Sequence, residues 1–277
     1  MLTQNTRVDP TEVYTARDLD ITYFVSRSRP LDLTGIVWDD VARSPITSDV
    51  IRTLRYMHEI ERHTVIFPRT IFSTRAVNDE VIGRFLTCWL YEESFHGPAL
   101  ARFLEAAGQS LPPQPCNRFI RTDRLEAIVI PILAALWSDF LALHMTWGAI
   151  HELTTITAYH RLATQAGHPI LTELLKRLIR EESRHFAFYY AQAKQRLARP
   201  RVAAVTRFLL QQLWTPVGHG VQSIQEERFV TEYLFTGSPG RSAARTVDRT
   251  IRRLPGLVNL PLLEAWIERK IGCWAKE

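Results

Sequence analysis

The sequence predicts an all-α protein: a four-helix bundle with an irregular N-terminal arm and additional C-terminal helices. Apolar residues recur at helical spacing along most of the chain, strand-like alternation is scarce, and Pro and Gly interrupt the pattern where helices should end. With 277 residues, 46% hydrophobic and 23% charged, the chain can form one core with an appended element and is too apolar for wholesale disorder. We expect an arm over residues 1–45, the bundle over 46–200, and a helical extension packed on the bundle over 201–277.

The arm and the first bundle helix are separated by the point at which helical periodicity begins. Residues 1–45 contain scattered prolines and no sustained period, which indicates an irregular segment that wraps the core. A helix is expected over 47–68, because Thr47 or Ser48 can cap its start. Helical spacing relates its apolar residues, which are Val50, Leu54, Met57 and Val65.

The second bundle helix is expected over 78–107, with Gly108 as its C-cap. Pro98 lies inside it and has no N–H to donate to the carbonyl of Ser94, so this turn should be loosened or kinked. The Pro-rich stretch 108–117 then connects the two halves of the bundle.

Two long helices complete the predicted bundle. The third is expected from Asp123 to Ala166 and the fourth from Pro169 to about Arg199, because a glycine can end one helix and a proline suits the first turn of the next. Shorter helices are expected in the extension, near 201–214, 221–235, 242–253 and 260–274.

Charge, cysteine content and hydropathy limit the partners and the compartment. The net charge of +5 favours an acidic partner but is too weak to indicate nucleic acid. Cys88, Cys116 and Cys273 show no C-x-x-C spacing, which indicates a reducing cytoplasm rather than a disulfide framework. The N-terminus shows no signal-peptide pattern, and the most apolar segment, 127–137, is shorter than the about 20 residues of a membrane-spanning helix. We expect a soluble, cytoplasmic protein with no nucleic acid or membrane partner.

Two segments carry the same metal-ligand spacing. Glu93 and His96 in one segment, and Glu182 and His185 in the other, each form Glu-x-x-His, and each pair is preceded by another Glu. Side chains three residues apart on a helix project from one face, so each pair can hold one metal ion. A single pair is more simply explained as a surface ion pair, whereas two pairs inside long helices indicate a metal site.

Carboxylates on the other two bundle helices would complete such a site. Glu152 lies between small and apolar neighbours on its helix face, so its carboxylate should point into the core, where its charge is costly unless a cation compensates it. On the first helix, Glu61 continues the apolar stripe, whereas Glu59 shares a face with arginines and is better explained as a solvated ion-pair residue. Glu61 is therefore the better ligand, with Glu59 as the alternative.

The predicted ligands are Glu61, Glu93, His96, Glu152, Glu182 and His185. One Glu from each of two helices and Glu-x-x-His from each of two others is the arrangement of ferritin-like di-iron and di-manganese bundles. Ligation by carboxylate and imidazole without thiolate favours iron or manganese over a structural zinc. The sequence therefore predicts a ferritin-like bundle that holds two iron ions, or a Mn/Fe pair, with O2 as co-substrate.

At these residues the chain resembles the soluble acyl-acyl-carrier-protein desaturases, over about residues 50–200. Residues 92–97, Glu-Glu-Ser-Phe-His-Gly, are similar to the Glu-Glu-x-Arg-His-Gly segment of that family, although Phe95 replaces the Arg. Residues 181–185, Glu-Glu-Ser-Arg-His, match its second segment, acid-Glu-x-Arg-His.

The resemblance extends to the third helix and implies roles for individual residues. Glu152 and Thr155 correspond to a Glu that has a Thr three residues later in the family. The resemblance therefore implies that the six predicted ligands bind iron and that Thr155, as a catalytic residue, lies beside the oxygen site.

The resemblance also implies a substrate and partners. The substrate would be a fatty acyl or related chain on an acyl carrier protein, the electron donor a ferredoxin-type protein, and the assembly a homodimer. An acidic carrier could bind either of two basic stretches, within 194–207 and 241–253. Core-facing residues that could line the acyl channel are Phe85, Trp89, Ile156 and Phe186.

Other functions use a similar ligand set. A di-iron hydroxylase or N-oxygenase of a natural-product pathway is one alternative, although arylamine oxygenases use an additional His ligand and His151 points about 100° away from Glu152 on a helix. A ferritin-like metal storage protein would need neither the extension nor a substrate channel. A ribonucleotide reductase radical subunit would need a tyrosine beside the metals, and neither Tyr91 nor Tyr159 stands out by its spacing.

Overall fold

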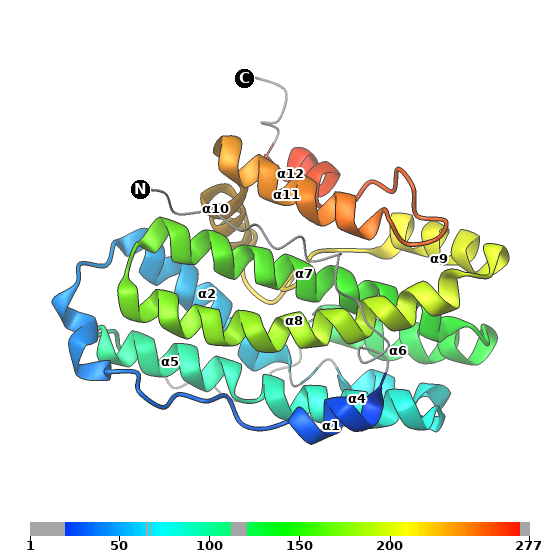
Figure 1. The fold of residues 1–277 in the computed structure, drawn as a ribbon. Helices are drawn as coiled ribbons and strands as arrows, with labels where there is room; N and C mark the ends of the chain where they lie inside the picture. The colour runs from blue at the N-terminus through cyan, green and yellow to red at the C-terminus, as the bar shows by residue number, and fades with distance from the viewer. Residues whose placement is uncertain (1–19, 65, 67, 112–120, 272–277) are drawn as a thin grey trace, which may run out of the picture.

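The computed structural model describes residues 20–64, 66, 68–111 and 121–271, and the side chains of 121–126 are not described. Every regular element within these ranges is a helix, which confirms the all-α prediction (Figure 1). Within the same ranges, no helix combines the length and apolar character that crossing a bilayer requires.

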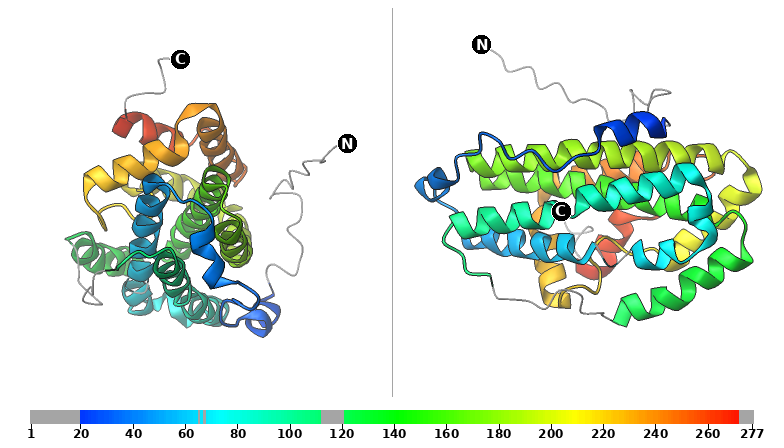
Figure 2. Two further views of the ribbon diagram at one scale, coloured as in Figure 1. Left: turned by 90° about the vertical axis from the view of Figure 1, so that its left-hand side faces the viewer. Right: turned by 90° about the horizontal axis from the view of Figure 1, so that it is seen from below.

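Four long rods lie side by side and form the bundle that holds the candidate site (Figures 1 and 2). Helix α2 (Ser48–Thr64) packs on α5 (His96–Ala106), and α7 (Phe140–Ala166) packs along the length of α8 (Pro169–Leu197). Helix α4 (Glu80–Glu93) precedes α5 in the second rod. Further contacts of α2 with α7 and of α5 with α8 close the bundle around one core.

The second rod is divided into α4 and α5. The sequence predicts one helix over 78–107 with a disturbed turn near Pro98. In the structure the helix is instead interrupted at Ser94 and Phe95, which lie between α4 and α5. Proline leaves the carbonyl of Ser94 without a donor, and the Phe95 N–H bonds to the Glu92 carbonyl three residues back, 3.0 Å away. Glu93 is thus the last residue of α4, and His96 is the first residue of α5.

Helices α7 and α8 form an antiparallel hairpin, as their sequence signals predict. Gly167 ends α7 with a positive φ of 58°, and Pro169 occupies the first position of α8. His168 Nδ1 accepts from the Leu171 N–H at 3.2 Å, so its Nε2–H donates to the Val41 carbonyl at 3.0 Å. His168 thereby joins the start of α8 to the arm.

Further predicted boundaries are wrong, and the helix expected over 47–68 ends at Thr64. The continuous helix expected over 123–166 is two helices, α6 (Arg121–Leu136) and α7, separated at 137–139, where Ser138 and Asp139 favour turns over helix. The arm is also not wholly irregular, since α1 (Ile21–Arg27) forms on Asp20, whose carboxylate accepts from two backbone N–H groups. A helix of seven residues is too short to show a period in sequence.

The C-terminal helices are α9 (Pro200–Leu213), α10 (Ile224–Phe235), α11 (Gly237–Ile251) and α12 (Leu263–Ile271). Three of them, α10, α11 and α12, lie above α7 in Figure 1, and α9 lies at the right-hand end of the bundle. Helix α11 packs on α7, α10 packs on α2, and α12 contacts both α10 and α11. The remaining elements are η2 (Trp38–Arg43), α3 (Pro68–Phe72) and η3 (Arg75–Asn78).

Candidate metal centre

The six predicted ligands meet in the middle of the bundle. Each comes from one of the four rods, and none is more than 7% exposed. They form two groups whose ligand atoms lie within 4.8 Å of one another: Glu61, Glu93, His96 and Glu182 in the first, and Glu93, Glu152, Glu182 and His185 in the second. Glu93 and Glu182 belong to both groups, so these two carboxylates could contact an ion held in either group.

The Nδ1 atoms of both histidines face these shared carboxylates. His96 Nδ1 lies 3.5 Å from Glu93 Oε2 and 3.3 Å from Glu182 Oε1. His185 Nδ1 lies 3.0 Å from Glu93 Oε1 and 3.2 Å from Glu182 Oε2. Glu61 Oε2, 3.8 Å from His96 Nδ1, completes the first group on its outer side.

The Nε2 atoms of the same histidines bind a second pair of buried carboxylates, and they do so crosswise. His96 of the first motif lies 3.0 Å from Glu181 of the second motif, and His185 of the second motif lies 2.7 Å from Glu92 of the first. Each Nε2 donates a proton to a carboxylate, so each Nδ1 lone pair is directed at the centre and available to a metal. Arg184 holds Glu92 from the other side at 3.0 Å.

The two outer carboxylates are also held by hydrogen bonds. Trp89 Nε1 donates to Glu152 Oε1 at 2.8 Å, and the Tyr159 hydroxyl donates to Glu61 Oε1. Both donors are buried, at 5% exposure for Trp89 and 1% for Tyr159. The orientation of every ligand except the two shared glutamates is therefore set by a neighbouring side chain.

Burial and crowding shift the pKa values of these groups. Burial has the largest effect on Glu61 and Glu152 and raises the pKa of both carboxyls well above the usual value, and repulsion from Glu93 and Glu182 raises it further. For His96, burial opposes the charged form, but Glu93 and Glu182 outweigh it and raise its pKa well above the usual value. Without a bound cation, the centre therefore retains protons that a divalent cation would displace.

The residues fit a pair of divalent ions. Glu93 Oε1 and His96 Nδ1 are fully enclosed and make no hydrogen bond, although buried polar atoms almost always have a partner. A metal ion would satisfy both atoms and would offset the charge of four buried carboxylates. The donor set of carboxylates and imidazoles suits iron or manganese.

A cavity of about 580 Å³ reaches this centre. Glu61, Glu93, Glu152 and Glu182 are part of its wall, and apolar residues of α6, α7 and the segment after α9 form much of the rest, including Val129, Leu133, Leu143, Trp147 and Val217. Its volume lies within the range of small-molecule sites. The centre is thus accessible to an apolar molecule that enters between the helices.

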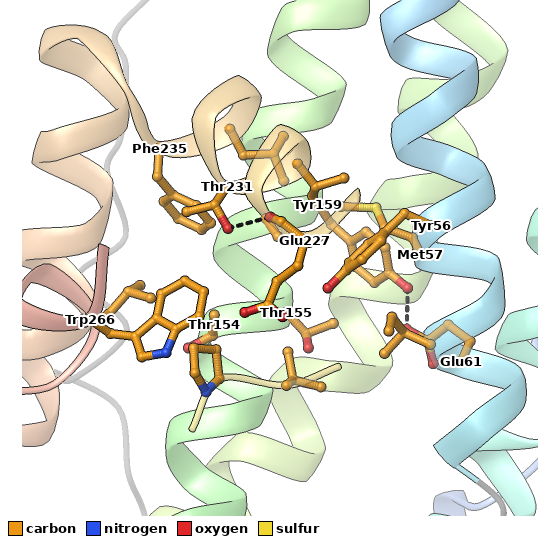
Figure 3. Close-up of a pocket in the computed structure, with 17 residues that line it drawn as sticks. Tyr56, Met57, Glu61, Thr154, Thr155, Tyr159, Glu227, Thr231, Phe235 and Trp266 are labelled. Atoms are coloured by element: carbon orange, nitrogen blue, oxygen red, sulfur yellow. Dashed lines mark hydrogen bonds between the residues drawn. The ribbon is translucent and has the colours of Figure 1, made fainter. Parts of the chain in front are cut away.

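A second cavity, of about 80 Å³, lies between α2, α7, α10 and α12 (Figure 3). Its polar wall residues include Tyr56, Tyr159 and Glu227. Glu61 and Thr155 line both cavities, as do Pro216 and Val217. The two cavities therefore approach the same ligand, Glu61, from different sides.

The structure distinguishes between the residues that the sequence left as alternatives. Glu61 lies in the cluster, whereas Glu59 pairs with Arg62 at 3.7 Å and with His58 at 3.8 Å, outside it. His151 lies 3.0 Å from the carbonyl oxygen of Thr215 and takes no part in the two groups.

The predicted channel residues are only partly placed as expected. Trp89 lines the large cavity, but Phe85, Ile156 and Phe186 line neither cavity. Phe85 instead stacks on Phe188 in the core, with ring centroids 4.0 Å apart. Helical periodicity shows that a residue faces inward but does not distinguish a packed core from a cavity wall.

Sequence reasoning missed the supporting residues. The sequence does show a second glutamate directly before the ligand glutamate in each motif, which is Glu92 in one and Glu181 in the other. Their role as hydrogen-bond partners of the ligand histidines becomes visible only in the structure, where the two motifs face each other. Tyr159 follows Glu152 by seven residues on α7, so it lies on the same helix face, two turns further on.

No protein-family model, curated protein or solved structure matches the chain, and the functional inference therefore rests on these side chains.

Proposed function

We propose that the protein is an O2-dependent di-iron oxidoreductase that desaturates a fatty acyl or related chain tethered to an acyl carrier protein. The observation that carries the proposal is the pair of ligand groups that share Glu93 and Glu182 beside a large apolar cavity. Glu61 and His96 would bind one ion, Glu152 and His185 the other, and the shared glutamates would bridge them. When bound, the ions supply the redox chemistry that reduces O2 and oxidises an unactivated C–H bond.

The residues of the chain hold and shield this chemistry. Glu92 and Glu181 fix the tautomers of the ligand histidines, and Trp89 and Tyr159 orient the outer carboxylates. Thr155 lines both cavities, as does the ligand Glu61, and would be the catalytic residue beside the oxygen site. The apolar cavity wall excludes bulk water and binds methylene groups.

The proposed carrier would bind close to the large cavity. Lys194, Arg199 and Arg201 are exposed near the junction of α8 and α9, and Phe208 and Leu213 are exposed on α9. Leu213 also lines the cavity. An acidic carrier could therefore contact these cations while its acyl group enters between the helices.

The second basic stretch is less suited to a carrier. Both basic stretches contain arginines that form ion pairs within the protein, such as Arg245 with Glu264 in this one and Arg199 with Asp139 in the other, so ion pairing does not distinguish them. The helix of the second stretch, α11, lies over α7 and contributes no residue to the wall of the large cavity. The stretch on α8 and α9 is therefore the one we propose.

A ferredoxin-type donor, a cytoplasmic location and a homodimer complete the proposal as sequence-based expectations.

Iron loading followed by mass spectrometry tests the proposal. We expect two ferrous ions per chain under anaerobic titration, and a carrier-bound acyl chain that loses two mass units after O2 and a reduced ferredoxin are added. A gain of sixteen mass units would assign the centre to a hydroxylase instead. Iron uptake far beyond two ions per chain would support the storage function and would contradict the proposal.

A further inference from the structure

We propose that His219 and Glu227 form a proton-delivery pair that serves the metal centre through the small cavity. The inference rests on the proposed oxygen chemistry. Conversion of a –CH2–CH2– unit and O2 to –CH=CH– and two water molecules requires two electrons from the donor and two protons from solvent. A path for these protons is therefore needed, and the apolar substrate cavity is a poor one.

Glu227 is the buried member of the pair. It lies on α10, is 6% exposed and belongs to the wall of the small cavity. Figure 3 shows its side chain directed toward Thr155, into the space between α10 and α7. A carboxylate in such a place is costly unless it is bound, and its one hydrogen-bond partner among the described residues is His219.

His219 is the more exposed member of the pair and lines the large cavity. Its Nδ1 lies 3.0 Å from both carboxylate oxygens of Glu227, and its side chain is 30% exposed. An imidazole can release a proton at Nδ1 while it gains one at Nε2, so it can pass protons from solvent to the buried carboxylate. The transfer breaks the Nδ1–H bond of His219 and forms an O–H bond on Glu227.

The small cavity spans the gap between Glu227 and the ligand Glu61. At about 80 Å³ it can hold about two or three water molecules, each with a liquid volume of about 30 Å³. Glu227 is at one side, and Glu61, with the Tyr159 hydroxyl bonded to it, is at the other (Figure 3). Tyr56 adds a hydroxyl to the wall, and burial, together with the negative charge of Glu227, raises the pKa of this hydroxyl.

The large cavity adjoins the same pair, because His219 is part of its wall. His144 and His151 line the same cavity, but burial lowers the pKa of each to about 4, so both are neutral near pH 7, whereas His219 bonds to a buried carboxylate. Segment 216–217 separates the two cavities and contributes to both walls. Protons that pass from His219 to Glu227 would thus reach Glu61 from the small cavity, whereas the acyl chain would reach it from the large one.

A purely structural role for the pair is the alternative, in which His219 only ties its loop to α10. Glu227→Gln separates the two roles, because the amide oxygen still accepts from His219 Nδ1 but the amide does not relay a proton. Glu226→Gln is the matched control, since Glu226 is the adjacent residue and binds Arg52 at the surface.

The experiment mixes the ferrous protein with O2, with and without acyl substrate, in H2O and in D2O. For Glu227→Gln we expect two irons per chain, an unchanged ferrous spectrum and an unchanged melting temperature, together with an O2 reduction rate lower by about 100-fold and a larger solvent isotope effect. His219→Ala should be slowed in the same way and partly rescued by added imidazole. Glu226→Gln should match the wild type.

The outcomes that would overturn the inference are distinct. If Glu227→Gln reduces O2 at the wild-type rate with an unchanged isotope effect, the pair does not deliver protons. If the variant loses iron or melts early, the pair is structural. Because O2 reduction is followed without substrate as well, a wild type that reduces O2 but desaturates nothing would refute the proposed substrate and leave the proton path testable.

Discussion

Glu92 and Glu181 have the same role, which is to orient the ligand histidine of the other motif. Each accepts from the Nε2–H of the histidine in the other motif, which holds that imidazole in the tautomer that a metal requires. Removal of such a partner costs about 10–100-fold in metal affinity.

We therefore expect Glu181→Gln to bind ferrous iron about 10–100-fold more weakly than the wild type. The amide can present its NH2 group to His96 and so favour the wrong tautomer. Competition with a chelator of known affinity measures the loss. Glu105→Gln, an exposed change on α5, is the control and should leave the affinity unchanged. Equal affinities for the two variants would remove Glu181 from the centre.

The two ligand groups also predict that substitution of Glu61 and substitution of Glu59, both on α2, change the iron content to different extents. Glu61 belongs to the first group only, so Glu61→Gln should reduce the iron content from two ions to about one per chain. Glu59→Gln should retain both ions because Glu59 lies outside the cluster. Iron analysis after gel filtration decides between them, and the reverse result would assign the ligand to Glu59.

At the scale of helices, sequence signals located most elements, and the exceptions have physical causes. Gly167 and Pro169 mark the α7–α8 turn in sequence and in structure, because glycine readily adopts the positive φ that ends α7 and proline has its φ fixed at a value that suits the first turn of α8. The division of the helix expected over 123–166 and the presence of α1 depend on tertiary packing, which periodicity does not record. For the site, the spacing of residues along each helix was enough to predict the six ligands. The crosswise hydrogen bonds of Glu92 and Glu181 and the two cavities could not be predicted, because they depend on how helices from distant parts of the chain face each other.

The close approach of α7 to α8 at Gly148 gives an element-scale prediction. A Cβ atom at Gly148 would lie 2.4 Å from Cε1 of Tyr189, so the aromatic ring packs directly on the α7 backbone. We expect Gly148→Ala to destabilise the protein by about 1–3 kcal/mol despite the better helix propensity of alanine. Urea unfolding measures the change, and the double variant with Tyr189→Ala should show a cost smaller than the sum of the two single costs. A strictly additive result would mean that the ring moves aside freely.

At the scale of the whole molecule, buried histidines link stability to pH. The pKa of His144 is lowered to about 4 by burial, below the value of 6.5 for an unfolded chain. The unfolded state therefore binds more protons between these values, and stability from this group is lost as the pH falls from about 6.5 toward about 4. The loss for His144 is about 3 kcal/mol.

We expect His144→Phe to flatten this acid-side decline relative to the wild type, because the variant has no proton to gain there. Urea unfolding at several pH values between 4.5 and 7 measures the difference in slope. The comparison between the two proteins isolates His144, since the carboxyls with raised pKa, such as Glu61 and Glu152, titrate in both. Parallel pH profiles would contradict the prediction.

Those carboxyls link metal binding to pH as well. Because their pKa values are raised without a cation, protons must leave when a divalent ion binds, so affinity should increase as the pH rises. A weakly buffered solution with a pH indicator should report acidification when Mn(II) is added. Glu61→Gln should release fewer protons, and an unchanged release would mean that Glu61 is ionised before the metal arrives.

The crosswise hydrogen bonds make the two Glu-Glu-x-x-His motifs interdependent in evolution. Each motif supplies a metal ligand set and also the carboxylate that orients the histidine of its counterpart. A lineage that alters one doubled glutamate must compensate in the distant partner helix or lose the ion. Substitutions at Glu92 and at the position of His185 should therefore be inherited together, as should those at Glu181 and His96, across any descendants of this chain.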